Sequence, residues 1–337
     1  MRRILIIGGG LSGCTVASKL AEADIEVFLV EKSSNIGGKV RLYGCKAVDD
    51  KCNNCGVCLT CGLWDKVLGH QNIRVLTHSV VKDITGKAGD FTATVEDPNH
   101  TRYIDKLDAI VVSTGFESQP QGMSSHLHIE GTEGLMTGLK LEEQLLERSR
   151  TGLLDRAPSS VAFIQCLGSR DEREGGLYCS RVCCSYSTRT AKVLRSYYPE
   201  CEITFFYMEL QNVKNGNYYE ELKELGMEFI KCRPLKIIGG KPVAIEYDDP
   251  AGGESLKTFD LVILSEGIHE GVDNQILSIV CGLRQDEDGF LHSMDSNPGI
   301  YVAGCVRAPM KIEEAYADSL ATAGKILASV PERGTVS

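Results

Sequence analysis

A glycine-rich turn between a buried strand and a helix constrains the fold of this chain more than any other feature. The turn spans residues 8–13 and reads G-x-G-x-x-G, directly after the apolar run 4–8 and before a helical pattern over 12–23. A second apolar run, 25–31, follows the helix. A strand–helix–strand unit of roughly 30 residues implies two parallel strands. The sequence therefore predicts one unit of a doubly wound α/β sheet.

The spacing of this turn also predicts the class of its ligand. The first glycine permits the tight turn, the second lets the backbone approach a pyrophosphate, and the third lets the helix pack against the strand. The phosphates would then lie at the N-terminus of the helix. Glu31 ends the second strand 18 residues after Gly13, where a carboxylate can accept hydrogen bonds from ribose hydroxyls. We therefore predict a dinucleotide site.

The rest of the chain predicts a second domain of the same type. With 337 residues the chain exceeds the usual size of one domain, and a second α/β pattern follows Pro158. The further expected strands are 73–84, 91–96, 107–112, 161–166, 202–207, 227–231, 235–238, 243–247, 260–264 and 300–303. The further expected helices are 139–150, 182–197, 217–225 and 311–328. We predict an α/β protein with two Rossmann-like doubly wound domains, residues 1–120 with 269–337 and residues 121–268.

Charge and hydropathy exclude several classes of partner. The 46 acidic residues outnumber the 36 basic ones, which gives a net charge of −10. Such a balance argues against a nucleic-acid partner, whose phosphates require clustered Lys and Arg. No apolar run approaches the roughly 20 residues that span a bilayer. Because the glycines at 8–10 interrupt the first apolar run, we predict no export signal and a cytoplasmic protein.

Fourteen cysteines are more than such a protein needs for packing. A two-domain chain without an export signal does not require disulfides, and thiols clustered at short spacing are more often metal ligands. Five cysteines lie between 45 and 61 and four between 166 and 184. The scattered ones are interpreted as small buried hydrophobic residues: Cys14, Cys201, Cys232, Cys281 and Cys305.

The second cysteine group predicts a metal centre. Cys166 ends the expected strand 161–166, at the edge where α/β sheets bind ligands, and Cys179, Cys183 and Cys184 follow around the start of the next helix. Four thiolates suit a [4Fe–4S] cluster or a Zn(Cys)4 site. A redox disulfide and buried thiols are the alternatives, although adjacent cysteines form strained disulfides. Arg170 is interpreted as solvated or paired, or as a charge that tunes the cluster.

Three segments resemble the two-dinucleotide flavoproteins of the thioredoxin-reductase and glutathione-reductase-like group. Residues 31–39 (Glu-Lys-x4-Gly-Gly-Lys) resemble that group's second glycine pair, and 113–115 (Ser-Thr-Gly) its turn after a buried strand. Residues 299–304 (Gly-Ile-Tyr-Val-Ala-Gly) resemble its C-terminal flavin motif. The resemblance implies FAD as the dinucleotide. The candidate FAD-binding residues are Gly8, Gly10, Leu11, Ser12, Gly13, Glu31, Lys32, Gly37, Gly38, Lys39, Val81, Thr114, Gly115, Gly304, Cys305, Lys311 and Ile312.

The chain departs from that group at two places. Cys305 stands where the group has Asp, and a thiol cannot bond a ribityl hydroxyl as a carboxylate does, so we interpret Cys305 as a packed small residue. The group's second glycine motif, for NADPH, is missing after strand 161–166, where the chain reads Cys-Leu-Gly-Ser-Arg. We therefore predict no nicotinamide site there. The helix after Pro309 is expected to direct its N-terminal N–H groups at the flavin.

Residues 161–192 resemble the cluster-binding stretch of the A subunit of heterodisulfide reductase, and the likeness extends over nearly the whole chain. It implies that Cys166, Cys179, Cys183 and Cys184 bind a [4Fe–4S] cluster. It also implies partner subunits, and electron transfer between flavin, cluster and thiol or disulfide chemistry in sulfur metabolism. The chain is shorter than the methanogen members, like the short subunits of bacterial complexes implicated in sulfur oxidation. Related flavoproteins are commonly dimers, so we expect a homodimer.

A second cysteine set, Cys52, Cys55, Cys58 and Cys61, remains open to three interpretations. It could ligate a second cluster, alone or with a partner subunit, or hold a dithiol that exchanges electrons with flavin. A purely structural role is the third. Two alternative functions follow: a self-sufficient flavin-dependent disulfide reductase that uses this dithiol, and a non-enzymatic zinc-binding scaffold. The missing nicotinamide motif argues against the first.

Overall fold

Two parallel sheets organise the chain, one in each of two units. The computed structural model describes residues 1–118, 133–151, 154, 156–172, 176–211 and 218–330. The first unit consists of Met1–Arg41, Gly56–Glu117 and His269–Ser337, and the second of Leu42–Cys55 and Ser118–Ile268. No helix of the described residues is both long and apolar enough to cross a membrane.

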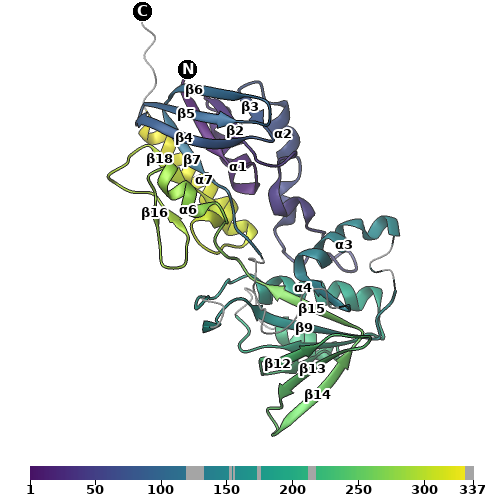
Figure 1. The fold of residues 1–337 in the computed structure, drawn as a ribbon. Helices are drawn as coiled ribbons and strands as arrows, with labels where there is room; N and C mark the ends of the chain where they lie inside the picture. Colours follow the sequence, from purple (N-terminus) through teal and green to yellow (C-terminus); the bar gives the residue numbers. More distant parts are fainter. Residues whose placement is uncertain (119–132, 152–153, 155, 173–175, 212–217, 331–337) are drawn as a thin grey trace, which may run out of the picture. The chain divides into compact units, whose positions relative to one another are not determined.

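The first sheet has five parallel strands in the order β18-β7-β1-β2-β3 (Figure 1). These strands are β1 (Arg3–Ile7), β2 (Glu26–Val30), β3 (Ile73–Leu76), β7 (Ala109–Val112) and β18 (Ile300–Val302). Because successive side chains of a strand point to opposite faces, Ile4 and Ile6 pack with α1 (Leu11–Ala21) and α7 (Ile312–Ser329). Leu5 and Ile7 face the opposite core.

That opposite core is closed by a three-stranded antiparallel sheet. It contains β4 (Val80–Lys87), β5 (Asp90–Glu96) and β6 (Thr101–Leu107), which contribute Phe91, Val95 and Leu107 to the core. The unit is completed by α2 (Leu63–Gly69), α6 (Asn274–Val280), the pair β16 (Arg284–Gln285) and β17 (Leu291–His292), and three short 3-10 turns. The 3-10 turns are η1 (Gly38–Leu42), η2 (Val57–Thr60) and η5 (Gly304–Val306).

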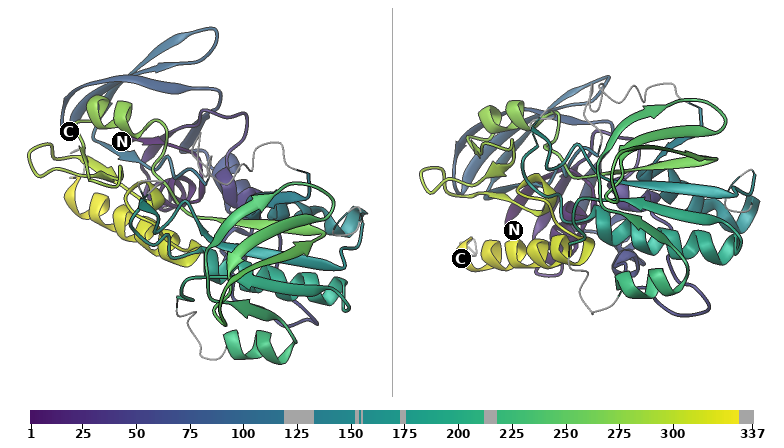
Figure 2. Two further views of the ribbon diagram at one scale, coloured as in Figure 1. Left: turned by 60° about the horizontal axis from the view of Figure 1, so that its bottom comes forward. Right: turned by 90° about the horizontal axis from the view of Figure 1, so that it is seen from below.

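The second sheet is also parallel, in the order β11-β10-β9-β15-β8. Its strands are β8 (Leu135–Thr137), β9 (Ser160–Leu167), β10 (Glu202–Phe206), β11 (Glu228–Ile230) and β15 (Leu261–Glu266). Its helices are α3 (Gly138–Thr151), α4 (Cys183–Tyr197) and α5 (Tyr218–Glu224). A second antiparallel sheet packs against it and is seen in green in Figure 2: β12 (Pro234–Ile238), β13 (Val243–Asp248) and β14 (Glu254–Phe259).

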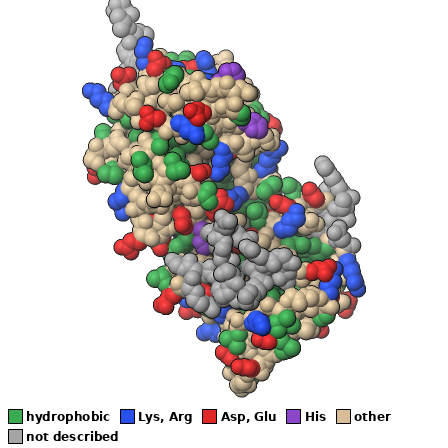
Figure 3. Space-filling view, in the orientation of Figure 1, with side chains coloured by type: hydrophobic (Ala, Val, Ile, Leu, Met, Phe, Trp, Pro, Cys, Tyr) green, Lys and Arg blue, Asp and Glu red, His purple; other side chains and the backbone are tan. Residues whose placement is uncertain are grey.

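The predicted fold class is confirmed, because both units are built on parallel Rossmann-like sheets. Several short elements were not predicted. Strands β6 and β14 were missed because their exposed faces carry mostly polar side chains, which leaves only a weak alternating pattern. The short elements β8, β16, β17 and α6 were missed as well. On the face that Figure 3 shows, acidic and basic side chains are interspersed over the surface.

Residues 42–55 pack with the second unit, whereas the expected division placed them in the first domain. Lys46 and Glu142 form an ion pair whose side chains are only 3% and 6% exposed. Lys46 Nζ also donates to the carbonyl of Gly44 at 2.8 Å. Arg189 Nε donates to the Asn53 carbonyl at 2.8 Å. These contacts attach the segment to α3 and α4, and charged residues that become buried in pairs give no apolar signal in the sequence.

Replacing Lys46 by methionine is expected to destabilise the second unit by about 3 kcal/mol. The substitution keeps the length of the side chain but leaves the buried Glu142 carboxylate without its cationic partner. The double variant Lys46→Met with Glu142→Leu should recover most of the loss, because neither member of this buried pair then carries a charge. Urea unfolding followed by circular dichroism measures both variants. Equal stability of the single variant and the wild type would contradict the prediction.

Candidate functional site

The predicted dinucleotide-binding turns lie together at one edge of the first sheet. The glycine turn 8–13 follows β1, Glu31 follows β2, turn 113–115 follows β7 and Gly304 follows β18. These four strands are neighbours in the order β18-β7-β1-β2 and run parallel. Their carboxyl ends therefore meet at one edge. The chain continues from β1 toward β2 and β3 and returns on the other side with β7, so the edge contains the switch point where α/β sheets bind ligands.

The glycine turn has no room for side chains. Gly8 has φ = +102°, and a Cβ there would lie 2.6 Å from the Ser113 carbonyl oxygen. A Cβ on Gly13 would lie 1.9 Å from the carbonyl oxygen of Gly8, because α1 packs directly against the end of β1. Gly10, in contrast, has only the Cα of Gly38 within 4.0 Å of such an atom. The turn is therefore tight toward the protein and open at Gly10, as the approach of a pyrophosphate requires.

Glu31 is held by hydrogen bonds from its own chain. Its Oε2 accepts the N–H of Gly9 at 2.7 Å, and its Oε1 accepts the N–H and the hydroxyl of Ser33 at 2.8 and 2.6 Å. The side chain is almost completely buried. A carboxylate oxygen can accept two hydrogen bonds, so Oε2 retains capacity for one ribose hydroxyl. Glu31 thus links the glycine turn to the end of β2 in the position that the sequence predicted.

The far end of the chain completes this edge. Gly304, with φ = +75°, lies so close to Ser12 that a Cβ would be 1.9 Å from the Ser12 hydroxyl. Its N–H donates to Asp318 Oδ2 at 2.8 Å. Cys305 is half-buried, and its thiol donates to the Met310 carbonyl at 3.5 Å. Burial raises the pKa of the Cys305 thiol to about 12. This geometry is that of a packed neutral residue.

The remaining candidate FAD-binding residues differ in how open they are. Gly115 has φ = +82°, and no atom lies within 4 Å of the place that a Cβ would occupy, so the turn after β7 is open. Lys32 pairs with Asp273 at 3.0 Å, and Lys39 donates to the Phe116 carbonyl at 2.8 Å, so protein groups already engage both ammonium groups. Val81 is buried in β4, and the other members lie on the same turns or flank them: Leu11, Gly37, Gly38, Thr114, Lys311 and Ile312.

The N-terminus of α7 is partly compensated by its own side chains. Glu313 and Glu314 lie in the first turn of the helix, and Glu314 Oε2 accepts the N–H of Lys311 at 3.0 Å. Carboxylates at this end offset the positive end of the helix dipole. The helix would therefore stabilise negative charge on a bound flavin less than it would without these two carboxylates.

Three of the four predicted cluster ligands are brought together in the second unit. Cys166 ends β9, and Cys183 and Cys184 begin α4, and all three are buried. The Cys183 side chain is hydrogen-bonded to both of the others. Cys166 has φ = +60°, in the left-handed region that favours glycine. Strained backbone at a non-glycine residue is typical of functional sites.

The surroundings of Cys166 and Cys184 favour negative charge on their thiols. The hydrogen bond from Cys183 lowers the pKa of Cys166, with smaller contributions from Arg170 and Arg233. The pKa of Cys184 is lowered to about 7, first by the hydrogen bond with Cys183 and further by backbone N–H groups and Arg170. The pKa of Cys183 is raised by its two hydrogen bonds and by burial. Arg170 is also paired with Glu209 at 3.1 Å.

The isolated cysteines behave differently. Burial raises the pKa of Cys201 to about 11 and that of Cys281 to about 12, as expected for small hydrophobic residues. Thiolates are the form that ligates metals. Cys166 and Cys184 therefore differ from these isolated cysteines in the direction of their pKa shifts.

Cys179, the fourth predicted ligand, is half-buried, and its Sγ accepts the N–H of Arg181 at 3.3 Å. In the described part of the chain, no three His, Cys, Asp or Glu side chains converge so that they could hold a single metal ion. Zinc requires four donors within about 2.3 Å of one atom. An iron–sulfur cluster spreads its thiolates over several iron atoms.

The set Cys52, Cys55, Cys58 and Cys61 lies where the chain passes from one unit to the other. The division falls between Cys55 and Gly56. All but Cys55, which is half-buried, are exposed, and none of the fourteen cysteines forms a disulfide. Asn54 N–H donates to Cys52 Sγ at 3.3 Å, and η2 places Cys58 and Cys61 around one short turn.

Sequence reasoning missed two residues of the second unit, Arg233 and Glu266. Arg233 lies far along the chain, and its guanidinium bonds Asp171 and donates to the carbonyls of Ser169 and Arg170 beyond β9. Glu266 ends β15, is buried, and accepts the N–H groups of Gly138 and Leu139 at the start of α3. Burial raises the pKa of Glu266. Neither residue is part of a recognisable motif, so only the fold reveals them.

Comparison with known proteins agrees with this geometry. Residues 6–53 match the family model described as an NAD(P)-binding Rossmann-like domain. The chain is 26% identical to the A subunit of the ferredoxin/F(420)H(2)-dependent CoB-CoM heterodisulfide reductase of Methanosarcina acetivorans, over 97% of this chain and 53% of the relative. It is 25% identical to the iron-sulfur A subunit of the CoB–CoM heterodisulfide reductase of Methanocaldococcus jannaschii, over 97% of this chain and 64% of the relative.

The solved structures show a shared fold. Thioredoxin reductase from T. acidophilum superposes with a TM-score of 0.66 at 18% identity, over 97% of this chain and 99% of that chain. The homologues at about 25% identity over most of this chain are therefore A subunits of heterodisulfide reductases, and the fold is that of thioredoxin-reductase-like flavoproteins. The chain spans between about half and two thirds of the length of the curated relatives it matches.

Proposed function

We propose that this chain is an electron-transfer subunit that binds FAD in its first unit and a [4Fe–4S] cluster in its second. It would serve a heterodisulfide-reductase-like complex and pass electrons between flavin, cluster and thiol or disulfide chemistry on partner subunits. The observation that carries the proposal is the presence of two differently built sites at the carboxyl edges of two similar sheets. One is a glycine turn with a carboxylate that can accept a ribose hydroxyl, and the other is a group of cysteines in which the pKa values of the buried Cys166 and Cys184 are lowered.

FAD is the dinucleotide that the motifs support. The Rossmann family model alone does not separate NAD(P) from FAD. The C-terminal turn at Gly304, however, lies against Ser12 of the glycine turn, so the last segment of the chain closes the first site. In the flavoproteins that the chain resembles, this closure accompanies FAD. Bound flavin supplies a centre that takes up two electrons and releases them singly. The residues of the chain position it and exclude the solvent.

For the cluster we propose Cys166, Cys179, Cys183 and Cys184 as ligands. Arg170 and Arg233 would compensate the negative charge of the thiolates, as would the N-terminal N–H groups of α4. The relative from M. jannaschii is named an iron-sulfur subunit, which supports this assignment. Cys52, Cys55, Cys58 and Cys61 would form a second ligand set or a dithiol. Their exposure supports a role in contact with a partner or a soluble thiol.

The relatives also support the setting of the reaction. Both are named as A subunits of heterodisulfide reductases, so we propose partner subunits of that kind for this chain. We further propose a homodimer, location in the cytoplasm and a role in sulfur metabolism, as in the short forms of such complexes. The chain lacks the second glycine motif where a nicotinamide would bind, which favours a partner subunit over NAD(P)H as the electron donor.

Quantification of FAD, iron, acid-labile sulfide and zinc in protein purified without oxygen tests the proposal. We expect about four iron and four sulfide per FAD, or about eight of each if residues 52–61 bind a second cluster. FAD without iron or zinc would overturn the cluster and favour the disulfide reductase with a dithiol. Zinc without iron would favour the scaffold. Addition of NAD(P)H alone should leave the flavin oxidised, and bleaching would contradict the assignment of the donor.

A further inference from the structure

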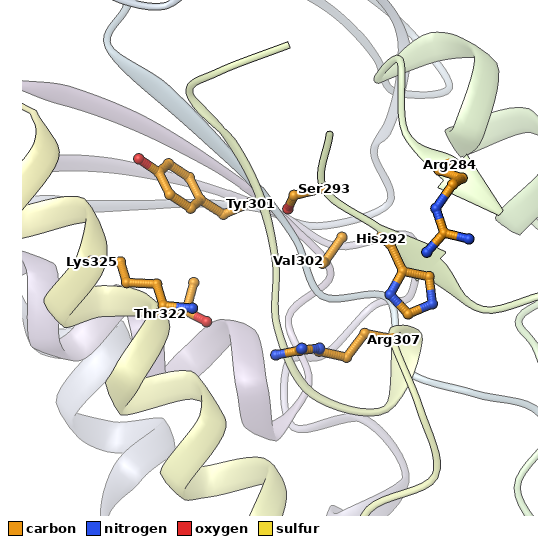
Figure 4. A pocket seen from close by; sticks show the side chains of 8 residues that line it. All are labelled: Arg284, His292, Ser293, Tyr301, Val302, Arg307, Thr322 and Lys325. Carbon is orange, nitrogen blue, oxygen red and sulfur yellow. The ribbon is translucent and has the colours of Figure 1, made fainter. Parts of the chain in front are cut away.

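A cavity of about 290 Å³ lies in the first unit, beside the outer edge of β18. Three segments form its wall: the hairpin β16–β17, the stretch from β18 to the residue after η5, and α7 (Figure 4). The eight residues that line it are Arg284, His292, Ser293, Tyr301, Val302, Arg307, Thr322 and Lys325. The dinucleotide turns lie at the carboxyl ends of the strands, whereas this cavity lies at the side of the sheet.

The wall of this cavity is positively charged, although the chain as a whole has a net charge of −10. The wall contains two arginines, one lysine and one histidine but no carboxylate. Outside the wall, Asp318 pairs with Arg307 at 2.7 Å and Asp286 with His292 at 2.6 Å. Arg284 and Lys325 have no ion-pair partner among the residues that the structure describes. The cavity therefore retains two uncompensated cations.

A hydroxyl group also lines this cavity. Thr322 is only 4% exposed as a residue, and its hydroxyl, which has no hydrogen-bond partner within the described ranges, is open to the cavity. Figure 4 shows this hydroxyl on the side of Thr322 that faces the guanidinium of Arg307. Like charges around one cavity repel each other, and a hydroxyl that opens into the cavity can donate a hydrogen bond to a bound oxygen. A bound anion would satisfy both groups at once.

The backbone offers a further donor to the same place. β18 is the edge strand of its sheet, and the N–H of Ala303 donates to Val112 in the neighbouring strand. Because successive N–H groups of a strand point to opposite sides, the N–H of Val302 points toward the outer edge, where the cavity lies. The donors therefore approach from a helix, a strand and a loop, that is, from several directions.

We propose that this cavity binds a small tetrahedral dianion, a phosphate or a sulfur oxyanion. Two uncompensated cations match a charge of −2, and donors from several directions match oxygens arranged around a tetrahedral centre. A planar carboxylate presents its oxygens on one side and would leave one of the cations unneutralised. Arg307 and the hydroxyl of Thr322 bind the oxygens on the inner side, Lys325 and Arg284 compensate the charge, and His292 lies at the rim.

The proposal is tested by calorimetric titration of the intact chain, with its cofactors, with sulfate, thiosulfate, sulfite and phosphate at constant ionic strength in chloride. We expect saturable binding of one dianion per chain. Lys325→Gln should weaken it about tenfold or more, as the loss of a charge-assisted hydrogen bond predicts. Thr322→Val, which keeps the shape but removes the hydroxyl, should weaken it roughly fivefold. Tighter binding of a sulfur oxyanion or of phosphate identifies which source of dianion the site prefers.

Lys87→Gln is the matched control, since Lys87 is an exposed lysine of the same unit on β4. It removes one positive charge and should leave binding unchanged. Absence of saturable binding, or an equal loss in the control and in Lys325→Gln, would overturn the proposal, because the second result indicates only nonspecific attraction. Circular dichroism and FAD content verify that each variant is folded. The measurement is of binding and does not depend on the proposed electron transfer, so either proposal can fail alone.

Discussion

Replacing Cys184 by serine is expected to remove the cluster of the second unit, so that the iron content falls by about four atoms per chain. Cys184 lies at the start of α4, where backbone N–H groups and Arg170 help to lower the pKa of its thiol to about 7. Serine has nearly the same size, but its hydroxyl remains protonated and does not replace a thiolate ligand. Iron, acid-labile sulfide and the visible spectrum measure the effect in protein purified without oxygen.

Cys201→Ser provides the matched control for this experiment. Cys201 is also buried in the second unit, but burial raises the pKa of its thiol to about 11. Its replacement should leave the iron content unchanged. FAD should be retained in both variants, because its predicted contacts all lie in the first unit. Full iron in Cys184→Ser would contradict the ligand assignment, and equal loss of iron in both variants would indicate general unfolding instead.

The glycine turn was predictable because its geometry restricts the residue type. A Cβ at Gly8 or Gly13 would overlap backbone atoms, so only glycine is compatible with this turn, and the apolar runs on both sides identify the strand and the helix. The position of Glu31 then follows from the length of one strand–helix–strand unit. For the same reason, the parallel sheets of both units could be predicted from buried runs such as 4–8 and 161–166.

The rest of the second site could not be predicted, because it depends on contacts between distant segments. Lys46 and Glu142 appear in the sequence as ordinary surface charges, yet they are buried against each other. Arg233 directly precedes β12 of the antiparallel sheet and contacts the turn after β9. The left-handed conformation of Cys166 has no signature in residue type, since glycine would be the expected residue there. The sequence predicted the cysteine group and offered Arg170 as a charge that could act on it, but it did not predict the contribution of Arg233.

Replacing Gly13 by alanine is expected to abolish FAD binding, with flavin content reduced at least about tenfold. The new Cβ would lie 1.9 Å from the Gly8 carbonyl oxygen and 2.8 Å from the Ser113 hydroxyl. The overlap is with backbone, so α1 must move away from β1. Its N-terminal N–H groups would then leave the position where they can bind a pyrophosphate. The flavin absorbance per chain after gel filtration measures the effect.

Gly324→Ala is the control because Gly324 also lies in a helix of the first unit, where nothing is within 4 Å of the added atom. Alanine at an exposed helical position should raise stability by about 0.5–1 kcal/mol and leave flavin binding unchanged. The two substitutions add the same methyl group and differ only in what it meets. If folded Gly13→Ala protein retained full flavin, the pyrophosphate could not depend on this turn. If both variants lost flavin equally, the loss would reflect helix stability rather than the geometry of the turn.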